Sequence, residues 1–183
     1  MSKLLKRSFF ERDTLKVAPE LLGKSIVIKS SSKKEKKGII VEVEAYTADD
    51  PACHASKGET QRTKVMFGPG GYSYVYLIYG MYHCLNFVSK KKSIPGAVLI
   101  RALEIPNEDI KAANGPGKLC RFFNLTKKHN NIDCTNSDSP IYLLDEGVYK
   151  TFDTVQTSRI GISNAKDYPW RWYIKGNKYV SRS

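Results

Sequence analysis

Alternation of side-chain type over eight residues constrains the fold of this chain more than any other feature. In the run IIVEVEAY (residues 39–46), one set of alternate positions is apolar, and the other holds two carboxylates and a tyrosine. The apolar set comprises Ile39, Val41, Val43 and Ala45, and the second set comprises Ile40, Glu42, Glu44 and Tyr46. A period of two places successive side chains on opposite faces of a β-strand. We therefore expect a strand that presents both carboxylates on the same face as Tyr46.

Further runs predict the elements around this strand. Strand-like segments occupy residues 25–29, 72–78, 81–88 and 96–105, with weaker ones at 140–144 and 170–174. The segment SSKKEKKG (residues 31–38) predicts a charged hairpin tip, and Tyr79-Gly80 predicts a tight turn. Helical spacing predicts one helix over residues 9–23, ended by Gly23, and another over 117–125. For the second helix, Asn114 is the predicted N-cap and Pro116 lies in the first turn.

The chain shows neither an internal repeat nor a linker, and its 183 residues suit one domain. The pattern predicts a single domain over residues 1–183 with an α/β fold of the mixed α+β kind. Its centre would be a curved, largely antiparallel β-sheet with flanking helices and a protruding β-hairpin.

Positive charge dominates the composition. The chain carries 30 Lys and Arg residues against 18 Asp and Glu residues, a formal net charge of +12 at pH 7. Such a surplus favours a polyanionic partner, with a Lys-rich proteome as the alternative explanation. No apolar run approaches the roughly 20 residues that cross a bilayer. The first residues have no apolar core or cleavage site, so we expect neither a signal peptide nor an anchor.

The four cysteines form no CxxC pair, although Cys53-His54 and His83-Cys84 place two metal-ligand types side by side. Structural zinc sites space their paired ligands by two to five residues, which this arrangement does not match. We therefore expect reduced, mostly buried thiols and no metal.

Tyrosines gather in one short stretch: five of the eleven fall between residues 72 and 82. Alternation places Tyr72, Tyr74 and Tyr76 on one face of a strand, which an ordinary aromatic sheet face would explain equally well. Tyr79 differs because it lies beside Gly80 in a predicted turn, where its ring should protrude. An exposed aromatic ring on a basic protein is typical of residues that stack on bases or enter a duplex.

Carboxylate, imidazole and phenol groups are predicted to share one pocket. Glu44 and Tyr46 lie on one strand face, and the irregular loop that comes next (residues 47–71) holds His54. These groups can grip an aromatic ring and activate water, although each alone is more often structural. Arg101 lies within the apolar run AVLIRALE and needs a carboxylate partner on a neighbouring strand if it is buried. That pair could be purely structural, or it could help Glu44 hold a nucleophilic water.

Taken together and in order, the motifs resemble those of the alkyladenine (3-methyladenine) DNA glycosylases. The resemblance rests on VEVEAY, DDPACHASKGETQRTKVMFGPGG, YSYVYLIYGMYHCLNFV and GAVLIRALE. It continues through FFERDTLKVAPELLGK, NGPGKLC and SRIGISNAKDYPWRWYIKGNKYVS, and so spans nearly the whole chain. The chain resembles the short bacterial members in having no long extension before the first motif.

The resemblance implies roles in hydrolysis and in opening the duplex. Glu44, in EAY, would deprotonate the attacking water, Arg101 would bind that water and a phosphate, and the carbonyl of Ile160 would complete the water site. Tyr79, in IYGMY, would occupy the space of the flipped nucleotide, and Met81 would help to open the base step.

The same resemblance implies a binding site for the flipped base. Tyr46 and His54 would lie on one side of the base and Tyr76 on the other. Asn86 would exclude the exocyclic amino group of normal guanine.

The resemblance implies a monofunctional enzyme that needs no metal and no organic cofactor. Neither the Glu44 strand nor the Tyr76 strand carries a lysine beside its pocket motif, so we expect no lyase step. The expected partner is double-stranded DNA that contains damaged purines. We expect the protein to be a monomer that is associated with the nucleoid in a bacterial cytoplasm. Two alternatives stay open. One is a non-catalytic nucleic-acid-binding module, and the other is a transferase, for which GPGG lacks dinucleotide-loop or Walker spacing.

Overall fold

The alternating run forms the centre of β3 (Glu35–Thr47), which is buried on both faces along most of its length. The computed structural model describes residues 2–29 and 35–182. One edge of β3 pairs with β6 (Gly96–Glu104), and the other edge is shared by β2 (Ser25–Lys29) and β9 (Arg171–Ile174). The register of the β3–β6 pair shifts on either side of Glu42, so the strict alternation predicted for this strand is interrupted there.

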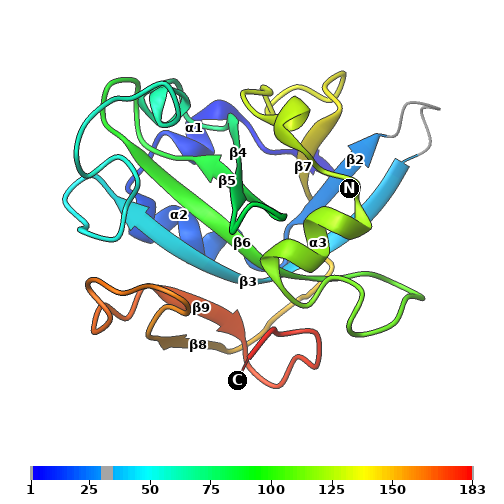
Figure 1. The fold of residues 1–183 in the computed structure, drawn as a ribbon. Helices are drawn as coiled ribbons and strands as arrows, with labels where there is room; N and C mark the ends of the chain where they lie inside the picture. Colours follow the sequence, from blue (N-terminus) through cyan, green and yellow to red (C-terminus); the bar gives the residue numbers. More distant parts are fainter. Residues whose placement is uncertain (1, 30–34, 183) are drawn as a thin grey trace.

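Among the described residues, nine strands form one sheet (Figure 1). Seven of them follow the order β1-β7-β2-β3-β6-β5-β4, while β9 pairs with β3 and β8 pairs with β9. The remaining bounds are β1 (Lys3–Leu4), β4 (Ser73–Ile78), β5 (Tyr82–Val88), β7 (Ile141–Asp145) and β8 (Thr154–Thr157). Every strand pair is antiparallel. The predicted curved antiparallel sheet of a mixed α+β domain is therefore confirmed.

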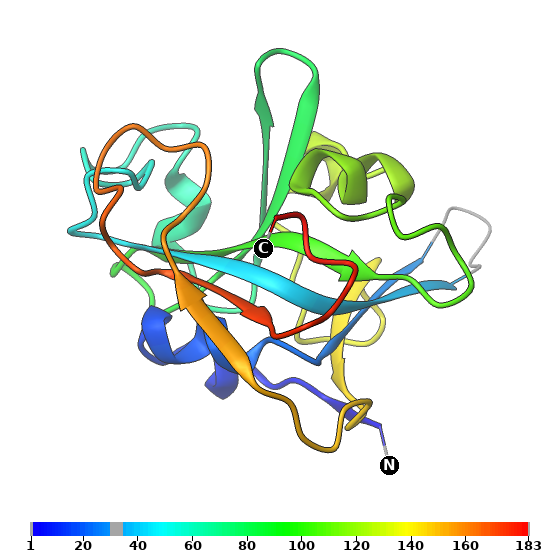
Figure 2. The same cartoon turned by 90° about the horizontal axis from the view of Figure 1, so that it is seen from below.

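Helices cover the sheet from two sides (Figure 2). α1 (Arg7–Phe10) and α2 (Thr14–Glu20) lie on one side, where α2 contacts β3 and β6. On the other side, α3 (Pro116–Phe122) packs against β5, the second strand of the β4–β5 hairpin. Short 3-10 turns, η1 (Lys64–Phe67) and η2 (Lys127–His129), lie in the connections. The apolar residues enclosed between these layers, such as Leu21, Ile100 and Leu119, form the main core.

The β4–β5 hairpin stands away from the body of the protein, as Figure 2 shows. Tyr79 and Gly80 both have positive φ angles, 53° and 70°, and the Met81 amide donates to the Ile78 carbonyl at 3.2 Å. Two central residues with positive φ define the turn type that matches the twist of a tight hairpin. The predicted turn at Tyr79-Gly80 and the protruding hairpin are both confirmed.

Several local predictions need correction. The helix predicted over residues 9–23 is two helices, because Asp13 accepts a hydrogen bond from the Leu15 amide at 2.9 Å and starts α2 anew. Gly115, not Asn114, is the N-cap of α3, and the Asn114 side chain instead accepts from Lys118 Nζ. The short strands β1 and β8 were not predicted.

Other predicted bounds can be compared directly. β2 has the predicted ends, and β7 and β9 differ from their predicted segments by a single residue at one or both ends. The charged hairpin tip predicted at residues 31–38 falls partly on residues 30–34, outside the described residues, and its second half belongs to β3 from Glu35 onward. All four cysteines are free and buried, as predicted. No helix within the described segments is long and apolar enough to span a membrane.

Candidate active site

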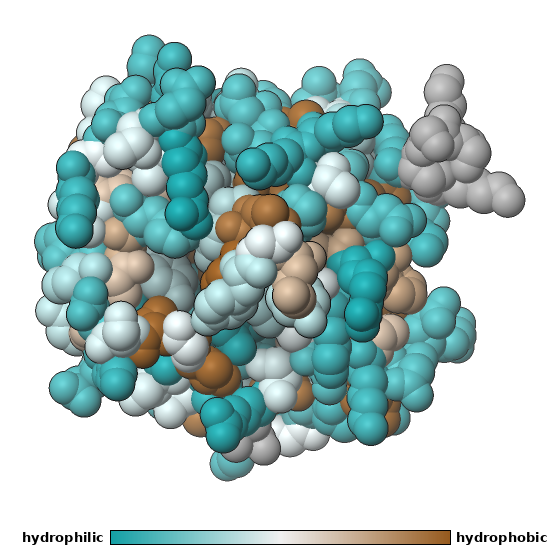
Figure 3. All heavy atoms as spheres, in the orientation of Figure 1, coloured by the Kyte–Doolittle hydropathy of each residue, from teal (hydrophilic) through white to brown (hydrophobic). Residues whose placement is uncertain are grey.

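A pocket of about 520 Å³ opens where the β4–β5 hairpin, α3 and two loops meet. Its size is typical of sites for small ligands, which occupy about 300–1,000 Å³. In Figure 3 this hairpin tip faces the viewer, and pale and brown side chains gather at the middle of a face with a hydrophilic rim. The predicted site residues that line the pocket are Tyr46, His54, Tyr76, Tyr79, Asn86, Arg101 and Ile160. Seven of the nine predicted positions thus meet in one cavity.

Aromatic rings form one wall of the pocket. The His54 and Tyr76 rings meet edge to face at 4.6 Å, and the Tyr74 and Tyr76 rings lie 5.2 Å apart. Alternation along β4 predicted that Tyr74 and Tyr76 share a face, and both line the pocket. Asn86 lies opposite Tyr74 on β5, and its side-chain amide donates to the Tyr74 carbonyl at 2.9 Å. This bond holds the Asn86 side chain at the pocket wall.

His54 is held as a neutral ring. Arg62 Nη2 lies 3.3 Å from His54 Nε2, and His54 Nδ1 lies 2.9 Å from the Tyr74 hydroxyl. An arginine only donates hydrogen bonds, so Nε2 accepts and Nδ1 carries the proton that is donated to Tyr74. Desolvation, and then the charge of Arg62, lower the pKa of His54 to about 4. The imidazole is therefore uncharged at neutral pH.

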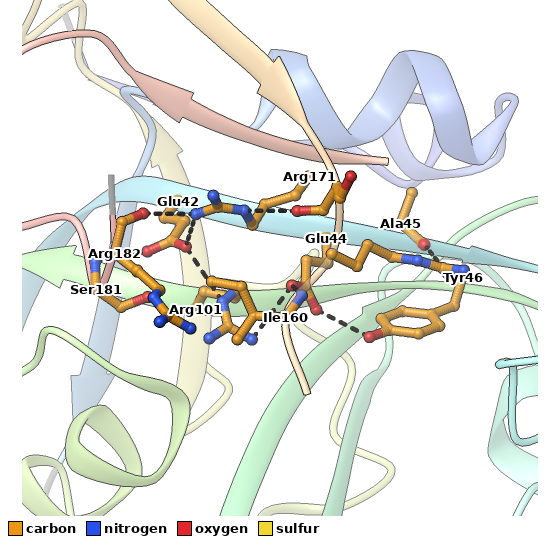
Figure 4. A network of polar contacts seen from close by, with 11 residues as sticks. Glu42, Glu44, Ala45, Tyr46, Arg101, Ile160, Arg171, Ser181 and Arg182 are labelled. Atoms are coloured by element: carbon orange, nitrogen blue, oxygen red, sulfur yellow. Dashed lines mark hydrogen bonds and ion pairs between the residues drawn. The ribbon is translucent and has the colours of Figure 1, made fainter. Parts of the chain in front are cut away.

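Glu44 lies directly behind the pocket wall, with no exposed surface of its own. Its Oε1 accepts from the Ile160 amide at 2.7 Å and lies 3.2 Å from Arg101 Nη1, while its Oε2 accepts from the Tyr46 hydroxyl at 2.8 Å (Figure 4). All three partners line the pocket. Burial raises the pKa of Glu44 above its usual value, and Arg101, the Ile160 amide and the Tyr46 hydroxyl oppose this rise.

Arg101 is the junction between two carboxylates. It bonds to Glu42 Oε1 through Nε at 3.2 Å as well as to Glu44, so the predicted carboxylate partner on the neighbouring strand is confirmed. Glu42 is itself fully buried and also accepts from Arg171 Nη1 at 2.8 Å and from the Ser181 amide at 2.7 Å (Figure 4). Two carboxylates and two guanidinium groups thus balance one another in the interior.

A second buried ion pair holds the segment that carries Ile160. The guanidinium group of Arg159 bonds to both carboxylate oxygens of Asp50, with Nη2 at 2.9 Å from Oδ1, and it donates to the Ala45 carbonyl at 2.9 Å. It also lies over the Tyr46 ring, 4.6 Å from the centroid. Asp50 lies in the irregular loop of residues 47–71, and sequence reasoning singled out neither Asp50 nor Arg159. The two residues are 109 positions apart in the sequence, and no local pattern around either one indicates that they form a pair.

At the tip of the hairpin, Tyr79 is 77% exposed and Met81 is 67% exposed. Tyr79 also contributes to the mouth of the pocket, whereas Met81 does not line it. The predicted protrusion of Tyr79 is confirmed. A Cβ added at the neighbouring Gly80 would meet no atom within 4 Å, so the turn has open space around it.

The opposite rim of the pocket was missed by sequence reasoning. It is formed by the first turn of α3, Gly115 to Lys118, together with Arg121. The motif NGPGKLC had identified this helix but gave no reason to place it against the Tyr-rich hairpin. Lys118 and Arg121 are exposed, so they add two cations to the mouth of the cavity. Among the described residues, no group of three His, Cys, Asp or Glu side chains is arranged to hold a metal ion.

Comparison with known proteins identifies the family. The sequence profile described as methylpurine-DNA glycosylase matches residues 8–178. A relative from Clostridium novyi (strain NT) is 46% identical over 98% of this chain and 99% of its own length. A relative from Legionella pneumophila (strain Paris) is 49% identical over 100% of both chains. A relative from Sodalis glossinidius is also 49% identical, over 92% of this chain and 95% of its own length. All three are named as 3-methyladenine DNA glycosylases. The chain therefore belongs to the methylpurine-DNA glycosylase family of DNA-repair hydrolases, which act on N-glycosyl bonds.

Proposed function

We propose that this protein removes alkylated purines from double-stranded DNA by hydrolysis, with the flipped base held in the pocket between Tyr46, His54 and Tyr76. The observation that carries the proposal is the contact of a fully buried carboxylate, Glu44, with three residues of the wall of an aromatic pocket. A module that only binds nucleic acid has no need of that carboxylate.

The first step is extrusion of the nucleotide, because water cannot reach C1′ of a stacked base. Flipping costs a few kcal/mol, and less at a damaged pair. Tyr79 is the residue that replaces the base in the stack, since it stands exposed at the tip of the hairpin. Stacking on an aromatic ring contributes roughly 1–3 kcal/mol per base, which offsets much of that cost. Met81, exposed beside it, helps to part the base step.

Recognition of the base depends on its charge. Alkylation at N3 or N7 gives a purine a positive charge, and electron-rich rings attract cations. Tyr46 and Tyr76 supply such rings, and the neutral His54 adds no repulsion of its own. We expect 3-methyladenine and 7-methylguanine as the main substrates, with hypoxanthine and ethenoadenine as slower neutral ones. Asn86 excludes normal guanine by opposing its exocyclic amino group.

In the chemical step, the oxygen of a water molecule attacks C1′ and the bond from C1′ to the purine nitrogen breaks. The electron pair of that bond goes to the base, so a cationic base leaves neutral, and a neutral base leaves as an anion that takes up a proton from solvent. Glu44 has no exposed surface, so a water reaches it only where one of its three partners at the pocket wall moves aside. Glu44 then takes the proton of that water, and Arg101 and the carbonyl of Ile160 orient it. Because Arg101 lies within 3.2 Å of Glu44, it also favours the ionised form that a base requires.

We expect the enzyme to act as a monomer, because a single chain supplies both the aromatic pocket and the Glu44–Arg101 pair at its wall. The net charge of +12 and the cations at the pocket rim, Lys118 and Arg121, favour phosphate contacts on duplex DNA. The relatives are bacterial, and we place the protein at the nucleoid of a bacterial cytoplasm. Neither a metal nor an organic cofactor takes part in the proposed reaction.

The test is to incubate the protein with methylated duplex DNA and to analyse the released bases and the strands separately. We expect free 3-methyladenine and 7-methylguanine, and intact strands that break only on later alkaline treatment. Absence of free base on every methylated substrate would contradict the proposed function. Strand breaks without alkaline treatment would contradict a purely hydrolytic mechanism.

A further inference from the structure

The Arg159–Asp50 pair packs against Tyr46 and does not line the pocket. Both side chains have no exposed surface. The Arg159 guanidinium lies over the Tyr46 ring at 4.6 Å, and the rings of Trp170 and Tyr168 surround it at 5.2 and 6.0 Å. Tyr46 itself lines the cavity. One face of the Tyr46 ring therefore contacts a fixed cation, and a base in the pocket would contact the part of the ring that Arg159 leaves uncovered.

A cation at this position bears on which bases the ring can hold. Attraction of a cation to an aromatic ring arises from the negative potential at the ring face. A guanidinium on one side of the ring weakens that potential and repels a second cation on the other side. The same guanidinium has little effect on a neutral base of similar shape. An unbalanced Arg159 would therefore disfavour charged purines in particular.

Asp50 provides the balance. It bonds to Arg159 through both carboxylate oxygens, so the two groups present a neutral pair behind the ring. A base stacked on the face of the Tyr46 ring opposite Arg159 would lie about 8 Å from the guanidinium. At an effective dielectric constant of about 20, two unit charges at that distance change an equilibrium by about thirtyfold. Solvent at the pocket mouth reduces this, so an effect of about tenfold is expected.

We propose that Asp50 is a specificity-determining residue, which lets the pocket accept cationic alkylated purines by neutralising Arg159 behind Tyr46. This inference rests on the proposed function and adds to it the charge selectivity of the base site. It assigns a role to a side chain that touches neither the base nor the water.

The experiment compares the single-turnover excision rates of 7-methylguanine, which is cationic, and hypoxanthine, which is neutral. The quantity measured is the ratio of the two rates on one enzyme preparation, since loss of folded enzyme lowers both alike. Asp50→Asn is expected to lower this ratio about tenfold. Asp49→Asn is the matched control: it removes the same charge from the neighbouring position, which is exposed and bonds to Thr47, so the ratio should stay unchanged.

Two further variants separate charge from structure. Asp50→Asn combined with Arg159→Met removes both charges, and the ratio should return toward that of the wild type. Arg159→Met alone leaves the carboxylate unbalanced, so the ratio should rise, which keeps the proposal testable if Asp50→Asn does not fold. Equal losses on both substrates in these variants would overturn the inference while leaving the proposed function intact. A wild type that releases neither base would instead contradict the proposed function.

Discussion

Replacing Arg101 with Gln should raise the pKa of Glu44 and shift the acidic limb of the pH–rate profile to higher pH. Burial already raises this pKa above the ordinary value of 4.5, and Arg101 is the strongest opposing influence. The variant removes that influence and leaves Glu42 as a nearby negative charge. A base must be ionised to work, so the rate at a fixed acidic pH should fall.

The geometry of the Arg101–Glu44 ion pair sets the size of the expected pKa shift. Arg101 Nη1 and Glu44 Oε1 are 3.2 Å apart, and both side chains are nearly or fully buried. At an effective dielectric constant of about 20, charges roughly 4 Å apart interact by about 4 kcal/mol, an upper limit near three pKa units. Neighbouring arginines usually lower a carboxyl pKa by about 1–3 units. We therefore expect the acidic midpoint to rise by about 1–3 pH units.

The assay is single-turnover excision of 7-methylguanine from pH 4 to pH 9, with folding checked by circular dichroism at each pH. Arg171→Gln is the control, because Arg171 is equally buried and bonds to Glu42 but not to Glu44. Arg101→Lys keeps the charge and should recover part of the shift. An acidic limb that stays in place in Arg101→Gln, or that moves as far in Arg171→Gln, would refute this role of Arg101.

Three further predictions concern the hairpin, the pocket rim and a buried turn. Tyr79→Ala should weaken binding to lesion duplexes more than excision of a base that is already extrahelical, and equal losses would argue against insertion into the stack. Borohydride should trap no covalent enzyme–DNA adduct, even though Lys118 lies at the pocket rim; a trapped adduct would disprove a purely hydrolytic enzyme. Gly71→Ala should lower the free energy of unfolding in urea by about 1–3 kcal/mol, because φ is +86° and the added Cβ would lie 2.5 Å from Thr135. Gly58→Ala, with a similar φ and no close neighbour, should cost only the backbone strain, so equal losses would exclude a steric cause.

The sequence predicted the strands and turns whose residue pattern is clear within a few neighbouring residues. β2 has the predicted ends because SIVIK is an apolar run bounded by Gly23-Lys24 and a polar stretch. The hairpin turn at Tyr79-Gly80 was predicted from the glycine between two strand-like runs. β8 was missed because TVQT is too short and too polar to show a period. It is a strand because it pairs with β9, which no local pattern reveals.

In the candidate site, too, individual residues could be predicted from the sequence, whereas contacts between distant segments could not. Family resemblance located Glu44, Tyr76 and Arg101, and the structure brings them to one cavity or directly behind it. The contacts that depend on distant segments were not predicted. The Ile160 amide reaches Glu44 across 116 residues, whereas the family resemblance had implied a role only for the carbonyl of that residue. The C-terminal segment likewise reaches Glu42 through Ser181, which gives the arginine network its last partner.

Glu44→Gln tests the proposed catalytic role of the buried carboxylate most directly, with binding and excision measured on the same preparation. We predict that the variant binds a 7-methylguanine duplex within a few-fold of the wild type, because the side chain is enclosed behind the pocket wall. Its single-turnover excision rate should fall by about 10²–10⁴-fold, as expected for loss of a general base. Excision near the wild-type rate by this folded, DNA-binding variant would contradict a role for Glu44 in activating water.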